Sequence, residues 1–108
     1  MGDLSRLEML SLSRNELSGE IPKSVGGLVS LMGLWVQGNR LGGEIPSEIG
    51  NMADLRYFWG YNNLLEGGIP REATWLKNLI EFKVDSSVLD QTSPEVLEYL
   101  QVKLGGLN

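Results

Sequence analysis

The sequence predicts a solenoid in which four units of 24 residues stack on one continuous core. The four prolines of the chain, Pro22, Pro46, Pro70 and Pro94, stand 24 residues apart. Asparagine recurs with the same spacing, and so do several apolar positions. Self-similarity at a fixed period of about 20 to 50 residues is the signature of repeat units that stack on their neighbours.

The apolar positions define the units in chain order. The recurring ones are Leu4, Leu28, Met52 and Leu76, then Leu7, Leu31, Leu55 and Leu79, then Leu10, Leu34, Phe58 and Phe82. We therefore expect a single domain over residues 1–108 with repeats at 4–27, 28–51, 52–75 and 76–93, followed by a helix at about 94–104.

Each unit contains a short strand that ends at an asparagine. Leu10 and Leu12 have the period-two spacing of a strand, so both point inward and the alternate residues point outward. Asn15, Asn39 and Asn63 follow the strands at a turn, where a side-chain amide can both donate to and accept from backbone groups. We expect these three to form a structural ladder.

The first unit, LSRLEMLSLSRNELSGEIPKSVGG, resembles the plant-type leucine-rich repeat, whose pattern is LxxLxxLxLxxNxLxGxIPxxLGx. The resemblance covers essentially the whole chain. It implies an α/β-type fold, a right-handed superhelix with a concave parallel β-sheet and a convex side of 3₁₀ or irregular backbone. It also implies a function in binding proteins or peptides.

The third and fourth units depart from this pattern. Gly60 stands where the other units have an inward apolar residue, and we expect Phe58 and Phe82 to fill part of the space. The fourth unit has Ser87 in place of the asparagine, which indicates that the array ends there. From Ser93 the signals are helical, and we expect a C-terminal capping helix whose apolar face is Leu97, Leu100 and Leu104.

The N-terminal end has no comparable cap in the sequence, because Met1 aligns with Val25, so the chain begins in the middle of a repeat. We expect either further repeats in a longer protein or another chain over that edge. In the isolated chain, an unpaired first strand beside exposed leucines predicts self-association.

Composition excludes several classes of function. Nine basic and fourteen acidic residues give a net charge of −5, so nucleic acid is not an expected partner. The chain has no cysteine and no histidine, and we expect no catalytic residues, no metal site and no cofactor. The absence of a long apolar run predicts no membrane span, while the lack of a signal peptide and glycosylation sequon favours an intracellular location.

The candidate binding site lies on the outward side of the strands, where two central strands carry four aromatic side chains. Trp and Tyr dominate binding hot spots because they bury large rigid surfaces. The charged residues Arg14, Glu81, Lys83 and Asp85 are interpreted mainly as solvated surface, and a catalytic pair of Glu81 and Asp85 is set aside because no cleft is evident. The candidate ligand-binding residues are Trp35, Trp59, Tyr57, Tyr61, Gln37 and Lys83.

Three hypotheses follow for function. The first is a non-enzymatic module that binds a protein or peptide through the aromatic residues. The second is a structural segment of a longer receptor-like or inhibitor-like protein, in which the aromatics only stabilise the sheet. The third is carbohydrate binding by stacking on Trp35 and Trp59, and the missing secretion features count against it.

Overall fold

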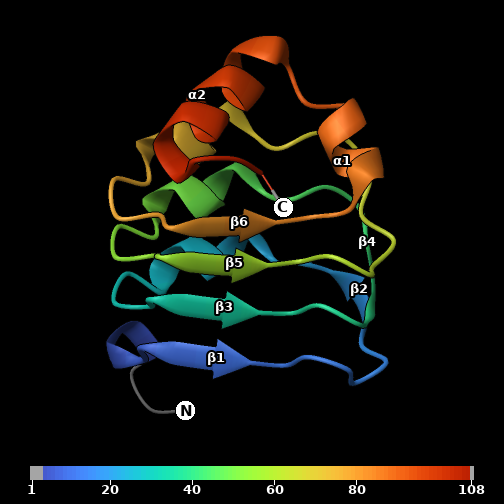
Figure 1. The fold of residues 1–108 in the computed structure, drawn as a ribbon. Coiled ribbons are helices and arrows are strands. Elements are labelled where there is room, and N and C mark those ends of the chain that lie inside the picture. The colour runs from blue at the N-terminus through green and yellow to red at the C-terminus, as the bar shows by residue number, and fades with distance from the viewer. Residues whose placement is uncertain (1–3, 108) are drawn as a thin grey trace.

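A four-stranded parallel sheet forms one side of the molecule. The computed structural model describes residues 4–107. The sheet has the order β1-β3-β5-β6, and Figure 1 shows its strands one above the other. The strands are β1 (Met9–Ser11), β3 (Gly33–Trp35), β5 (Tyr57–Trp59) and β6 (Glu81–Lys83). Each strand comes from one repeat, as the solenoid prediction requires.

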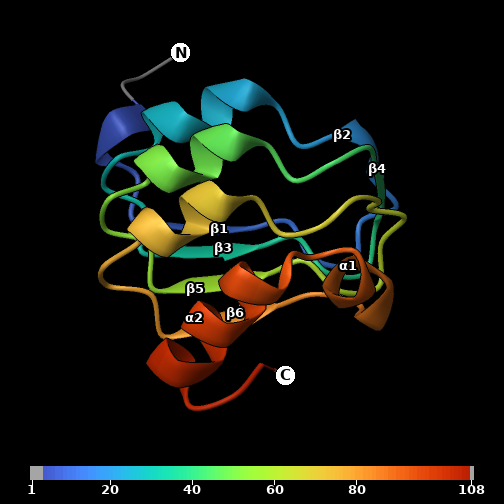
Figure 2. The ribbon, with the colours of Figure 1, turned by 90° about the horizontal axis from the view of Figure 1, so that it is seen from above.

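Short 3₁₀ helices form the opposite side of the molecule, as Figure 2 shows. They are η1 (Leu4–Arg6), η2 (Lys23–Gly27), η3 (Ser47–Asn51) and η4 (Arg71–Trp75). A second parallel sheet, formed by β2 (Ser18–Glu20) and β4 (Arg40–Gly42), lies on the flank between the two sides. The predicted parallel sheet and 3₁₀ side are confirmed, whereas the flank sheet was not predicted.

The recurring prolines begin the 3₁₀ helices. In the second repeat the carbonyl of Pro46 accepts a hydrogen bond from Ile49 N–H (3.1 Å), and the carbonyl of Ile49 accepts one from Met52 N–H (3.1 Å). The same pattern starts at Pro22 and Pro70. Proline suits this position because its fixed φ is compatible with helical backbone and it needs no partner for an N–H.

The core lies between the sheet and the 3₁₀ helices. Leu31, Met52, Leu55 and Phe58 are all fully buried. Phe58 also fills the space beside Gly60, where an added Cβ would come within 2.7 Å of its ring. The missing side chain in the third repeat is therefore replaced by an aromatic ring of the same strand, as expected for Phe58.

Two helices end the chain, α1 (Ser86–Asp90) and α2 (Pro94–Leu104), and both lie beyond β6 in Figure 1. Ser93 Oγ accepts a hydrogen bond from Val96 N–H (3.4 Å) at the start of α2. Val96 and Leu100 are buried, and Leu104 packs against the core. The C-terminal capping helix is thus confirmed, but Val96 takes the place expected for Leu97, and α1 was not predicted.

The side-chain amide of Asn39 connects the first two turns. Its Oδ1 accepts hydrogen bonds from the N–H groups of Asn15 (2.9 Å) and Leu17 (3.0 Å). Its Nδ2 donates to the carbonyls of Leu12 (2.8 Å) and Val36 (2.9 Å). These four backbone groups lie at the point where each turn leaves the sheet, so a buried polar region is satisfied by one side chain.

Asn63 repeats this arrangement between the second and third turns. It accepts from Leu41 N–H (3.0 Å) and donates to the carbonyl of Val36 (2.9 Å). Asn15 differs from the expected ladder residue, because it is exposed and its side chain donates to the carbonyl of Ser13 within its own turn (3.1 Å).

In the fourth turn the acceptor is Asp85, whose carboxylate takes the N–H groups of Asn62 (2.9 Å) and Asn63 (3.3 Å). In the alignment of the repeats, the residue equivalent to Asn63 is Ser87, which stands two residues after Asp85.

The first repeat is less buried than the others. Leu4, Leu12 and Leu17 are 46%, 36% and 37% exposed, and they line an apolar groove at the open end of the core. Leu7 and Leu10 pack against the core from the same end.

The turn after each of the first three strands of the sheet has a positive φ at the same repeat position. Gly38 has φ 74° and Asn62 has φ 55°, and both residue types tolerate this region. Arg14 occupies the equivalent position with φ 58°, where its Cβ is disfavoured.

Asn39→Ala should lower the free energy of unfolding by about 1 to 3 kcal/mol, because buried backbone groups lose their partner. Urea melts measure the difference. The control is Asn15→Ala, which should change stability by less than about 0.5 kcal/mol at an exposed site. Equal losses in the two variants would contradict the role of the Asn39 amide.

Arg14→Gly should raise the free energy of unfolding by about 1 kcal/mol, because it removes a side chain from a left-handed backbone position. Arg56→Gly serves as the control at an exposed arginine outside the positive-φ residues, and it should destabilise by about 0.5 to 1 kcal/mol. The prediction fails if Arg14→Gly is no more stable than the parent chain in urea.

The 108-residue chain should self-associate through the exposed leucines and the unpaired edge of β1. Sedimentation equilibrium should give a mass above 11.9 kDa that rises with protein concentration. Leu12→Lys together with Leu17→Lys should restore the monomer mass. A monomer at every concentration of the parent chain would overturn this expectation.

Candidate functional site

The solvent side of the four-stranded sheet, called the sheet face below, carries the predicted binding residues. The strands pair in register, so Ser11 lies opposite Trp35, Trp35 opposite Trp59, and Trp59 opposite Lys83. The four predicted aromatic residues are all half-buried, and they form one contact series that we call the aromatic patch: Trp35, Tyr57, Trp59 and Tyr61.

The rings of the aromatic patch contact one another in different orientations. Trp35 stacks with Tyr57 at a centroid distance of 6.2 Å and an interplanar angle of 18°. Trp35 meets Trp59 edge to face at 6.4 Å, and Trp59 meets Tyr61 at 6.1 Å with a tilt of 42°. These separations lie within the range of favourable aromatic pairs, so the rings hold one another in place.

Trp35 lies across the backbone of Gly33, two residues earlier in β3. A Cβ built on Gly33 would overlap three atoms of the Trp35 ring, and Gly33 is itself buried. Any larger residue at position 33 would therefore move the ring. The spacing of the repeats gives no sign of this role for Gly33.

Two charged residues of β6 support Trp59. Its Nε1 donates to Glu81 Oε1 at 3.0 Å, and Lys83 Nζ lies 4.4 Å from the ring centroid in a cation–π arrangement. Lys83 also pairs with Glu81 at 3.8 Å. The interpretation of Glu81 and Lys83 as mainly solvated surface is therefore wrong, because both side chains contact the aromatic patch.

Gln37 and Asp85 continue the sheet face at the ends of their strands. The Asp85 carboxylate is committed to backbone N–H groups, so it too is more than a solvated charge. Within residues 4–107, Gln37 Oε1 is the buried side-chain oxygen or nitrogen atom that has no hydrogen-bond partner. Sequence reasoning selected Gln37 only for its position next to the aromatic strands.

The described residues offer no grouping for metal chemistry. No set of three or more Asp, Glu, His or Cys side chains in residues 4–107 is arranged to hold a metal ion. In the same range, every helix is too short or too polar to cross a membrane.

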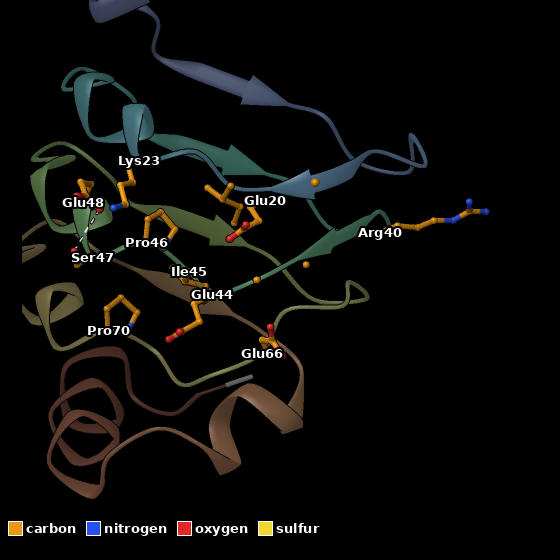
Figure 3. Close-up of a pocket in the computed structure, with 14 residues that line it drawn as sticks. Glu20, Lys23, Arg40, Glu44, Ile45, Pro46, Ser47, Glu48, Glu66 and Pro70 are labelled. Carbon is orange, nitrogen blue, oxygen red and sulfur yellow. Dashed lines mark hydrogen bonds between the residues drawn. The ribbon is translucent and has the colours of Figure 1, made fainter.

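A groove of about 790 Å³ lies on the flank, away from the aromatic patch. Figure 3 shows the carboxylates of Glu20 and Glu44 along it, with Pro46 and Pro70 on the side of the 3₁₀ helices and Arg40 extending outward. Glu20 and Glu44 are exposed, and the groove also has the basic residues Lys23 and Arg40 in its lining. The sheet face remains the candidate site, because it carries the aromatic patch.

The comparison with protein families matches the Leucine Rich Repeat at residues 6–28 and 30–52. A comparison with curated proteins finds no match. Among solved structures, a chain in the complex of the plant peptide hormone receptor RGFR1 with RGF2 is 39% identical, with a TM-score of 0.68 over 71% of this chain and 13% of that chain.

Two further structures come from Arabidopsis. The receptor kinase HAESA with the peptide hormone IDA and the co-receptor SERK1 gives 36% identity and a TM-score of 0.73 over 76% of this chain and 14% of that chain. The BIR3–SERK2 complex gives 36% identity and a TM-score of 0.69 over 71% of this chain and 42% of that chain. This chain thus spans less than half of the length of each similar structure.

Other similar structures are described as ectodomains, including that of the plant membrane receptor kinase GASSHO1/SCHENGEN3 from Arabidopsis thaliana. These structures are extracellular parts of membrane receptors, which does not fit the expected intracellular location.

Proposed function

Because this chain is a leucine-rich-repeat protein of the plant type, we propose that it binds a protein or peptide ligand through the aromatic patch, without catalysis. The observation that carries the proposal is the continuous contact series from Trp35 to Tyr61 on the solvent side of the sheet. Similar structures hold peptide hormones and co-receptors, and such partners are the class proposed here.

The patch has the properties of a preformed binding surface. Its rings are half-buried, and Gly33 below Trp35 and Lys83 over Trp59 restrict their movement. A restricted side chain loses little conformational entropy when a ligand covers it, so more of the contact energy appears as affinity. Gln37 and Lys83 lie beside the rings and complete the proposed ligand-binding set.

Carbohydrate binding is less well supported. A sugar ring carries several hydroxyl groups that need partners when it is buried. The carboxylates of Glu81 and Asp85 are already bonded within the protein, and the hydroxyls of Ser11 and Ser13 lie 3.4 Å from each other. The sheet face thus offers aromatic surface with few uncommitted polar groups, which suits a peptide with apolar side chains.

The remaining alternative is that the aromatics serve the sheet alone. Cross-strand aromatic pairs contribute about 0.2 to 1 kcal/mol each, so the contacts of Trp35 and Trp59 add some stability in any case. Binding and stability must therefore be measured separately.

Trp35→Ala with Trp59→Ala should abolish ligand binding while the fold persists, because an interface Trp contributes about 2 kcal/mol or more, a factor of about thirty in affinity for each. Dodecapeptides selected from a phage-displayed random library on the parent chain serve as probes, with affinity measured by calorimetry. Circular dichroism should be unchanged, and the melting temperature should fall by only a few degrees.

Trp75→Ala is the matched control, since Trp75 is 58% exposed on η4, on the opposite side from the sheet. It should leave peptide affinity unchanged. Undiminished binding by the folded double variant would refute the proposal, and unfolding of that variant would favour a purely architectural role.

A further inference from the structure

The unpartnered oxygen of Gln37 is a feature that the fold does not explain. Side chains in a native interior are hydrogen-bonded in the large majority of cases, and a buried acceptor without a partner lowers stability. Gln37 Oε1 is buried and unpaired within residues 4–107, whereas the comparable amide of Gln91 is used, its Oε1 accepting from Gly67 N–H at 3.1 Å.

The position of Gln37 places this oxygen at the candidate site. Gln37 follows Trp35 by two residues, so the two side chains leave the backbone on the same side. Its carbonyl accepts from Arg14 N–H (3.0 Å), and Gly38 N–H donates to Tyr61 (3.1 Å), so the backbone at this point is held between neighbouring turns. The backbone of Gln37 is therefore fixed next to the aromatic patch.

Resting on the proposed function, we propose that Gln37 fixes the register of a bound peptide, its side-chain oxygen accepting a hydrogen bond from a backbone N–H of that peptide. The amide turns outward as the peptide covers Trp35, and the oxygen gains the partner that it lacks in the free protein. The cost of the unpaired oxygen in the free state sets an upper limit on the free energy by which this pairing favours the bound state.

A peptide is the occupant that the surroundings favour. One N–H meets the need of one acceptor, while apolar side chains on either side of it contact the rings. The carboxylates of Glu81 and Asp85 are committed to other donors, and Gln37 Oε1 is the buried acceptor beside Trp35 that lacks a donor within residues 4–107.

Gln37→Met tests the inference, because methionine has nearly the same shape and no strong acceptor. The melting temperature of the free protein should be equal to or higher than that of the parent chain, since a buried unpaired oxygen is removed. Affinity for the library-selected dodecapeptide should fall about tenfold, because its N–H loses a partner.

Gln91→Met is the matched control, since it removes a glutamine whose oxygen has a partner. It should lower the melting temperature by less than about 4 °C, because the lost hydrogen bond is solvent-exposed, and leave peptide affinity unchanged. Methylation of each peptide nitrogen in turn locates the donor. Methylation at one position should lower the affinity of the peptide for the parent chain about tenfold. The same methylation should not lower its affinity for the Gln37→Met variant any further, as expected for two groups that interact with each other.

The outcomes separate the inference from the proposed function. A lower melting temperature for Gln37→Met, or unchanged affinity for a peptide that still requires Trp35 and Trp59, overturns the role of Gln37 and leaves the proposed function intact. If the library gives no peptide that requires these tryptophans, or if cellohexaose binds the patch instead, the proposed function fails and the inference fails with it.

Discussion

The structure depends on how backbone polar groups are satisfied where each turn leaves the sheet. The chain changes direction there while its backbone remains inside the molecule, and water cannot supply the missing hydrogen bonds. The amide of Asn39 carries both a donor and an acceptor, so it serves carbonyls and N–H groups of two turns together. Neither a hydroxyl nor a carboxylate in this position could reproduce that set of bonds. These hydrogen bonds therefore set how successive turns are placed relative to one another.

The sheet face follows from that placement. Once the turns are aligned, Trp35 must lie opposite Trp59, and residues that are distant in sequence become neighbours across strands. Gly33 then admits the Trp35 ring close to the backbone, and Lys83 covers Trp59 from the next strand. The arrangement of the aromatics is thus set largely by the backbone and by small or charged neighbours, which leaves the rings ordered before any ligand arrives.

Sequence periodicity was sufficient for the repeat units and the strands, and the helix start at Ser93 and Pro94 for the capping helix. The 3₁₀ side was expected from the resemblance to the plant-type leucine-rich repeat. The flank sheet was missed because Ser18–Glu20 combines glycine and polar residues of low β-propensity. Asp85 was missed as an acceptor because it stands two residues before the aligned position. Side-chain contacts such as Glu81 with Trp59 depend on rotamers, which no spacing reveals.

The two sheets differ in the register between turns, and this difference has a geometric consequence. The four-stranded sheet pairs residues 24 apart, as in Leu10 with Leu34, whereas the flank pairs residues 22 apart, as in Ser18 with Arg40. Equivalent positions on the flank are therefore displaced by two residues per turn, or about 6 to 7 Å along the strand. A side chain repeated in every unit forms a straight row across the sheet but a slanted row along the flank. An elongated ligand perpendicular to the strands can thus meet the same repeat position in successive turns on the sheet face but not on the flank.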